Sequence, residues 1–180
     1  MNILSGWREQ YDRMIRSRDQ LIEVATGSGP QLISSDHARD ALLHFYMDAY
    51  HLKDWIGNDP AAGTASTSVE DFVKATATLR LCADLANGAK HLKLTSTKTG
   101  DMQTGISSQS IIVQPGTVRA RATVNDGGPI TATENVPADD PMPALHSWEA
   151  TSAGKMHDLV ALADDVVATW TAWLQQQHLL

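Results

Sequence analysis

Four polar residues fall at helical spacing inside one of the most apolar stretches of the chain, LRLCADLANGAKHLKL. They are Arg80, Asp84, Asn87 and His91. Steps of three and four residues bring side chains onto one stripe of an α-helix. Leu, Ala and Cys side chains cover most of the remaining surface, and a helix that is apolar nearly all round is usually buried. Buried Arg, Asp and His side chains must be paired or hydrogen-bonded. The stripe therefore predicts either a structural polar network or a functional site.

Hydrophobic periodicity predicts four helices along the chain. They cover about residues 5–26, 35–56, 68–91 and 153–177, with an end near residue 86 left open for the third. Apolar side chains recur in three of these helices at steps of three and four residues, and these side chains are the predicted core. They are Trp7, Tyr11, Met14, Leu21, Ile22, Leu42, Phe45, Ala49, Leu52, Ile56, Met156, Leu159, Val160, Ala163, Val167, Trp170 and Leu174.

Capping residues set the predicted ends of the helices. Ser34 or Ser35 can cap the second helix, because a serine hydroxyl accepts a hydrogen bond from the first free backbone N–H groups. Ser68 and Asp71 have the spacing of a capping box, which predicts that the third helix begins at Ser68. The Gly-Ser-Gly-Pro run at 27–30 ends the first helix.

The stretch 92–135 has a different composition, in which Thr, Ser, Gly and Val replace Leu and Ala. The segment SIIVQPGTVRARATV alternates around a turn at 114–117, which predicts a β-hairpin, and a third strand is expected near ITATE. An exposed link is expected at 136–143. We therefore predict a mainly α protein, a four-helix-bundle-like single domain over 1–180, with a small antiparallel β insertion between helices 3 and 4.

The cysteine count, the lengths of the apolar runs and the net charge argue against several classes of protein. A lone cysteine, Cys82, permits no intramolecular disulfide, and its place in an apolar helix predicts an inert packed thiol. The first 20 residues lack the apolar core of a signal peptide, and no run is apolar enough to span a membrane, so we expect a cytoplasmic protein without membrane contact. The net charge of −7 argues against broad binding to nucleic-acid phosphates.

The second predicted helix carries its own polar stripe. Its members are Asp40, His44, Asp48 and His51. If the second and third helices form an antiparallel hairpin, His44 lies at the depth of Arg80 and Asp84, which predicts a polar seam between the two helices. Solvent exposure of the second stripe is the alternative, because the stripe lies opposite the core face. The candidate binding residues of the seam are His51, Arg80, Asp84, Asn87, Lys90 and His91.

Metal and cofactor chemistry have little support in the sequence. Spacings such as Asp48-x-x-His51 offer ligands, yet the Glu-x-x-His pairs typical of di-metal bundles are absent. The glycine-rich nucleotide loops, the CxxC pair and the GxSxG elbow are absent as well. We therefore expect no metal and no cofactor.

The segment Arg39-Asp40-Ala41-Leu42-Leu43-His44 resembles the motif of HEPN ribonucleases, an Arg followed after four to six residues by a His, with a polar residue after the Arg. In that family these residues act on RNA across a dimer interface of small helical bundles. The resemblance implies that Arg39 would steady the scissile phosphate, Asp40 would orient it, and His44 would take or give the proton. A HEPN-like, metal-independent ribonuclease is therefore the alternative function, with RNA as its partner.

The segments HLKDW (51–55) and NGAKH (87–91) together resemble paired segments of uncharacterised bacterial helical proteins. That resemblance implies a helical hairpin with a shared function and names no activity. We expect a non-secreted bacterial interaction or regulatory protein, with a defence or toxin-like module as one setting. Its partner would be another protein or a second copy of the chain, and the polar stripes would organise the bundle or bind a small anion.

Overall fold

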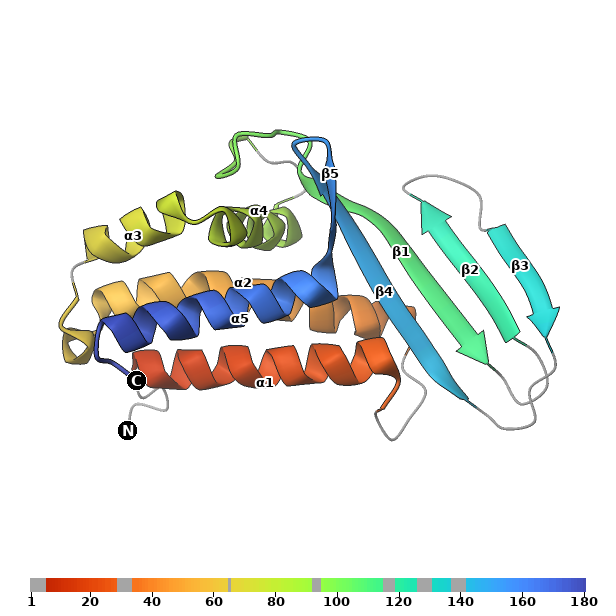
Figure 1. Cartoon of the computed structure of the whole chain (residues 1–180), viewed down its shortest axis with the longest axis horizontal. Helices are drawn as coiled ribbons and strands as arrows, with labels where there is room; N and C mark the ends of the chain where they lie inside the picture. Colours follow the sequence, from red (N-terminus) through yellow and green to blue (C-terminus); the bar gives the residue numbers. More distant parts are fainter. Residues whose placement is uncertain are drawn as a thin grey trace.

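A computed structural model describes residues 6–28, 34–64, 66–91, 95–114, 119–125, 131–136 and 142–180, with backbone alone at 112–114, 119–125, 131–136 and 142–144. The prediction of a mainly helical protein with an antiparallel sheet is confirmed, and Figure 1 shows the helices packed together with the sheet extending from them. The elements are α1 (Trp7–Thr26), α2 (Ser35–Asn58), the 3₁₀ turn η1 (Pro60–Ala62), α3 (Ser66–Ala75), α4 (Ala77–Lys90), β1 (Gly105–Gln114), β2 (Arg119–Asn125), β3 (Thr131–Val136), β4 (Met142–Ser152), β5 (Lys155–Asp158) and α5 (Leu159–Gln176).

The predicted third helix is two helices. Thr76 lies between α3 and α4 in an extended conformation, with φ −100° and ψ 115°. Its side-chain hydroxyl donates to the Phe72 carbonyl at 2.8 Å, so it satisfies the end of α3 rather than capping α4. Branching at Cβ makes threonine a weak helix former, which favours a break at this position. The predicted start at Ser68 is also wrong, because α3 begins at Ser66.

Several predicted helix ends agree with the structure. The Ser34 side chain accepts a hydrogen bond from the His37 amide at 3.2 Å and so caps α2. Gly27 adopts a left-handed conformation, with φ 64°, at the end of α1. The predicted end of α2 at residue 56 is two residues short, because the helix continues to Asn58.

The sheet has five antiparallel strands in the order β3-β2-β1-β4-β5 among the described residues. β1 pairs with β2, as the predicted hairpin requires; Gln114, the first residue of the turn predicted at 114–117, belongs to β1, and the rest of that turn lies outside the described residues. β3 corresponds to the strand expected near ITATE. The expected link at 136–143 is wrong at both ends, because β3 extends to Val136 and β4 begins at Met142; residues 137–141 lie outside the described part.

The predicted final helix begins six residues later than expected, at Leu159. The residues assigned to its start form a tight β4–β5 hairpin instead, because Ala153 and Gly154 both adopt left-handed conformations, with φ 50° and 72°. Two successive positive φ angles suit the turn of a two-residue hairpin. Asp158 then caps α5 by accepting from the Val160 and Ala161 amides.

The core lies between the helices and β4. Trp148 of β4 and Trp170 of α5 are among the largest fully buried side chains. α2 packs against α1, α3, α4 and α5, and α1 also packs on β4. The predicted core face of α2 is buried throughout, whereas the predicted core residue Met156 is 70% exposed because it lies on β5 rather than in α5. Among the described helices, none has the length and apolarity needed to cross a membrane.

Candidate functional sites

Asp84 of α4 is the buried centre of the predicted polar stripe. Its residue exposure is 1%, and its carboxylate accepts three hydrogen bonds from the segment that follows α4. Oδ1 accepts from the Lys98 amide at 2.6 Å, and Oδ2 accepts from the Thr99 amide at 2.9 Å and the Thr99 hydroxyl at 2.6 Å. Hydrogen bonds to an acid side chain from backbone amides satisfy a buried charge. Asp84 therefore fixes the path of the chain at 98–99.

A chain of hydroxyl groups continues from Asp84 into the sheet. Thr99 Oγ1 lies 3.0 Å from Thr104 Oγ1, which lies 2.8 Å from Ser152 Oγ. Because the Thr99 hydroxyl donates to Asp84, it accepts from Thr104, and Thr104 accepts from Ser152. These three hydrogen bonds connect the end of β4 to α4.

The remaining members of the α4 stripe do not join Asp84. Arg80 is half-buried and its guanidinium donates to the Lys74 carbonyl at 2.6 Å. Asn87 is half-buried, and Lys90 and His91 are exposed at the helix end. The His91 amide donates to the Asn87 carbonyl at 2.9 Å, so α4 extends to Lys90 with His91 as its cap.

The two predicted stripes do not face each other across α2 and α4. Cys82 approaches the Tyr46 carbonyl of α2, with Sγ 3.7 Å from the oxygen, so the Cys82 side of α4 faces α2. Asp84, two residues later, points to the opposite side of the helix. His44 is exposed, and among the described residues the hydrogen bonds of the Asp84 carboxylate go to residues 98–99. The expected proximity of His44 to Asp84 is therefore wrong.

The other residues of the second stripe are mostly in solvent. Arg39, Asp40, His44 and His51 are exposed. Arg39 pairs with Asp36 at 2.9 Å, one turn before it on α2. Asp48 is half-buried and accepts a 2.6 Å hydrogen bond from the Ser17 hydroxyl, which fastens α2 to α1. Within the described part of the chain, the Arg39–Asp36 pair is the ion pair of this motif, and no hydrogen bond or ion pair joins the His44 side chain to an acid or base.

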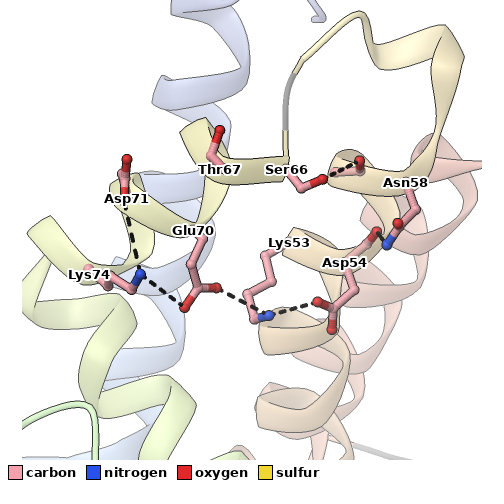
Figure 2. Close-up of a pocket in the computed structure, with 9 residues that line it drawn as sticks. Lys53, Asp54, Asn58, Ser66, Thr67, Glu70, Asp71 and Lys74 are labelled. Carbon is pink, nitrogen blue, oxygen red and sulfur yellow. Dashed lines mark hydrogen bonds and ion pairs between the residues drawn. The ribbon is translucent and has the colours of Figure 1, made fainter.

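A polar seam does exist between α2 and α3, formed by residues that sequence reasoning did not select. It lines a pocket of about 400 Å³, which we call the α2–α3 pocket. Figure 2 shows Glu70 directed toward Lys53, with Asp54 on the other side of that lysine. The lining residues are Lys53, Asp54, Gly57, Asn58, Ser66, Thr67, Glu70, Asp71 and Lys74.

Glu70 is the centre of the charge network in the α2–α3 pocket. Its carboxylate lies 2.7 Å from the Lys98 ammonium, 3.3 Å from that of Lys53 and 3.9 Å from that of Lys74. The Lys53 ammonium also contacts Asp54 at 2.7 Å. Asp54 and Asp71 are the outer carboxylates, with side chains 53% and 77% exposed. Glu70 and its lysine partners thus form the floor of the pocket, and the exposed rim carries Asp54, Asp71 and the ammonium of Lys74.

The charged forms are favoured in this network. The hydrogen bond from Lys98 holds the pKa of Glu70 below its ordinary value against the effect of burial, and the same bond raises the pKa of Lys98. Burial would lower the pKa of Lys53, but its hydrogen bond to Asp54 and the charges around it raise it. A general acid or base works best with a pKa near the working pH. These shifts suit a fixed pattern of charge for recognition rather than proton transfer.

Close contact of two helix ends shapes one wall of the α2–α3 pocket. The Ser66 hydroxyl at the start of α3 donates to the Gly57 carbonyl at 3.0 Å. A Cβ atom built on Gly57 would lie 3.0 Å from the Cα atom of Ser66, so a side chain at this position would push the helices apart. Glycine at 57 thus permits the approach of α3 to α2.

A second hollow, of about 450 Å³, lies between α4, the β4–β5 turn and α5, and we call it the α4–β5 pocket. Arg80, a member of the predicted polar stripe, is one of the residues that line it. Sequence reasoning missed its other polar residues, because they come from segments far apart in the chain. The polar lining residues are Thr78, Arg80, Thr99, Ser152, Lys155, His157 and Asp165.

In the described part of the chain, no group of three or more His, Cys, Asp or Glu side chains is placed to hold a metal ion. Comparison of the chain with protein-family models, with curated proteins and with solved structures finds no match.

Proposed function

We propose that this chain is an interaction or regulatory protein that binds a basic segment of a protein partner in the α2–α3 pocket. The observation that carries this proposal is the arrangement of charge around Glu70. Lys98 pairs with Glu70 on the pocket floor and Lys53 bridges Glu70 and Asp54, whereas the outer faces of the Asp54 and Asp71 carboxylates stay exposed at the rim. A basic side chain of the partner that approaches Asp54 or Asp71 from solvent would find complementary charge.

Lys74 is the side chain that a basic residue of the partner would displace. Its ammonium lies 3.9 Å from Glu70 and 4.0 Å from Asp71, and its side chain is 56% exposed. Exposed ion pairs of this kind contribute little to stability. An incoming arginine can therefore displace Lys74 at small cost and form bidentate hydrogen bonds with a rim carboxylate.

The scaffold in this proposal is a single, bundle-like helical domain. We treat α3 and α4 as two halves of one bundle element interrupted at Thr76, so that the strands form an insertion between the third and fourth bundle elements. The packing of α2 against α1, α3, α4 and α5 supports this description. The bundle then holds the ends of α2 and α3 at a fixed distance for recognition.

The proposal is tested by NMR titration of the ¹⁵N-labelled protein with the peptide N-acetyl-Gly-Arg-Gly-amide and with the matched peptide that carries Glu in place of Arg. We expect saturable shifts at 53–58 and 66–74 with the Arg peptide alone, and loss of these shifts in the Asp54→Asn and Asp71→Asn double variant. Asp36→Asn is the matched control, because Asp36 is exposed at the other end of α2. Equal shifts with both peptides, or none at these residues, would contradict the proposal.

A further inference from the structure

We propose that the α4–β5 pocket is a separate binding site for a small organic anion, one with a carboxylate or phosphate head and an apolar body. The site shares no lining residue with the α2–α3 pocket. It brings together α4, the β4–β5 turn and the first turns of α5, three parts of the chain that meet only in the folded protein (Figure 1).

Two cationic side chains that lack carboxylate partners indicate that the head group of the ligand is an anion. Among the described residues, neither Arg80 nor Lys155 takes part in an ion pair. The single hydrogen bond of the Arg80 side chain goes to the backbone carbonyl of Lys74, which leaves most of the five guanidinium N–H donors available. Unpaired cations that line a common hollow attract an anion.

The side chains that line the hollow carry a net positive charge on a protein that is acidic as a whole. Asp165, the carboxylate among the lining residues, offsets one of the two cations and leaves one positive charge before His157 is counted. The whole chain carries a formal charge of −7. The neighbouring carboxylates of Asp84 and Asp101 are already engaged by backbone amides, so Arg80 and Lys155 remain the charged groups available to an anionic ligand.

The hydroxyl groups of the pocket divide into two kinds. Thr99 donates to Asp84, and Ser152 donates through Thr104 to Thr99, so these two hydroxyl protons are already engaged. Thr78 lies in the first turn of α4 and lines the same hollow. The donors that remain for a bound anion are therefore Arg80, Lys155, His157 and Thr78.

The apolar residues that line the pocket indicate that the remainder of the ligand is apolar. Leu81 and Leu162 are buried, with 4% and 7% exposure, and they contribute apolar wall to the hollow. Pockets with apolar walls and a few convergent polar groups are typical of small-molecule sites. A volume of about 450 Å³ also exceeds what a bare inorganic ion would fill.

The proposal is tested by calorimetric titration of the whole protein with phenyl phosphate, benzoate and the neutral probe benzyl alcohol. We expect saturable binding of at least one of the two anions and none of the alcohol, and the better anion identifies the head group. Arg80→Met and Lys155→Met should each weaken binding about tenfold or more, the effect of losing one charge-assisted hydrogen bond. Lys90→Met is the matched control, because Lys90 is exposed at the far end of α4.

A gain-of-affinity variant keeps the test decisive if Arg80→Met does not fold. Asp165→Asn removes the carboxylate from the exposed rim and should strengthen anion binding about two- to fivefold. Failure of both anions to bind, equal binding of benzyl alcohol, or affinity unchanged in all three pocket variants would overturn the proposal. Asp54→Asn should leave anion binding intact, so failure of the peptide-binding proposal and failure of this one are distinguishable.

Discussion

The backbone amide of Lys98 lies 2.6 Å from the buried Oδ1 of Asp84, and this contact holds a segment that serves two pockets. From Lys98 the side chain reaches Glu70 at the floor of the α2–α3 pocket, while the next residue, Thr99, lines the α4–β5 pocket. One buried carboxylate thus positions adjacent residues for two different hollows.

Asp84→Asn should destabilise the protein by about 2–4 kcal/mol, because one of the two accepting oxygens becomes an NH2 group that faces the amide of either Lys98 or Thr99 in a buried site. The free energy of unfolding from urea titration measures this change. Asp40→Asn is the control, since Asp40 is exposed on α2 and its substitution should change stability by less than about 0.5 kcal/mol. Similar values for the two variants would show that the hydrogen bonds of Asp84 contribute little.

The contribution of Glu70 to stability should depend on pH in a defined direction. The hydrogen bond from Lys98 lowers the pKa of Glu70 in the folded protein, so the stabilisation is present above the ordinary pKa of about 4.3 and is lost as pH falls through the lower folded value. Because its side chain is 27% exposed, solvent screening limits the effect to about 1 kcal/mol or less.

Unfolding free energies of the wild type and Glu70→Gln, measured from pH 3 to pH 7, check this prediction. Their difference should be constant near neutrality and shrink below about pH 4. Glu23→Gln is the control, because Glu23 is exposed on α1. A difference that grows on acidification would mean that the charged form of Glu70 is not the stabilising one.

Local periodicity in the sequence was enough to predict the main helices and much of their core. The apolar stripe of α2 is buried as predicted, and Asp84 lies in the buried part of its helix. Its partners could not be predicted, because Lys98 and Thr99 follow at a distance of 14 and 15 residues in a segment without periodicity. The break at Thr76 depends on one side-chain hydrogen bond to Phe72 within an otherwise helical pattern.

The two pockets could not be predicted from the sequence either, because residues far apart in the chain line each of them. Glu70 and Lys74 have the spacing of an ordinary exposed helix pair, and nothing local brings Lys53 to Glu70. Lys155 and Arg80 line the same α4–β5 pocket because a two-residue turn reverses the chain before α5. The predicted α5 pattern extended through that turn, since Met156 matched the helical spacing by chance.

The ribonuclease alternative has a direct test at His44. Both Arg39 and His44 are exposed, and Arg39 pairs with Asp36, so among the described residues no hydrogen bond or ion pair holds this histidine in a catalytic arrangement. We therefore expect His44→Ala to leave any cleavage of a labelled RNA oligonucleotide unchanged. His178→Ala is the control, because His178 is an exposed histidine near the end of the chain. Cleavage that is lost in His44→Ala and retained in His178→Ala would favour the HEPN-like function.

Ala153→Gly should stabilise the protein, although most alanine-to-glycine changes do the reverse. Ala153 has φ 50°, a left-handed conformation that costs a residue with a Cβ atom about 1 kcal/mol, whereas glycine adopts it freely. The substitution keeps the backbone amide, which donates to Asp101 Oδ2 at 2.6 Å and anchors the β4–β5 turn. We expect a gain of about 0.5–1 kcal/mol in the free energy of unfolding. Ala172→Gly, at an exposed position inside α5, should lose a similar amount. If both variants lose stability, the left-handed turn beside the α4–β5 pocket is not strained at Ala153.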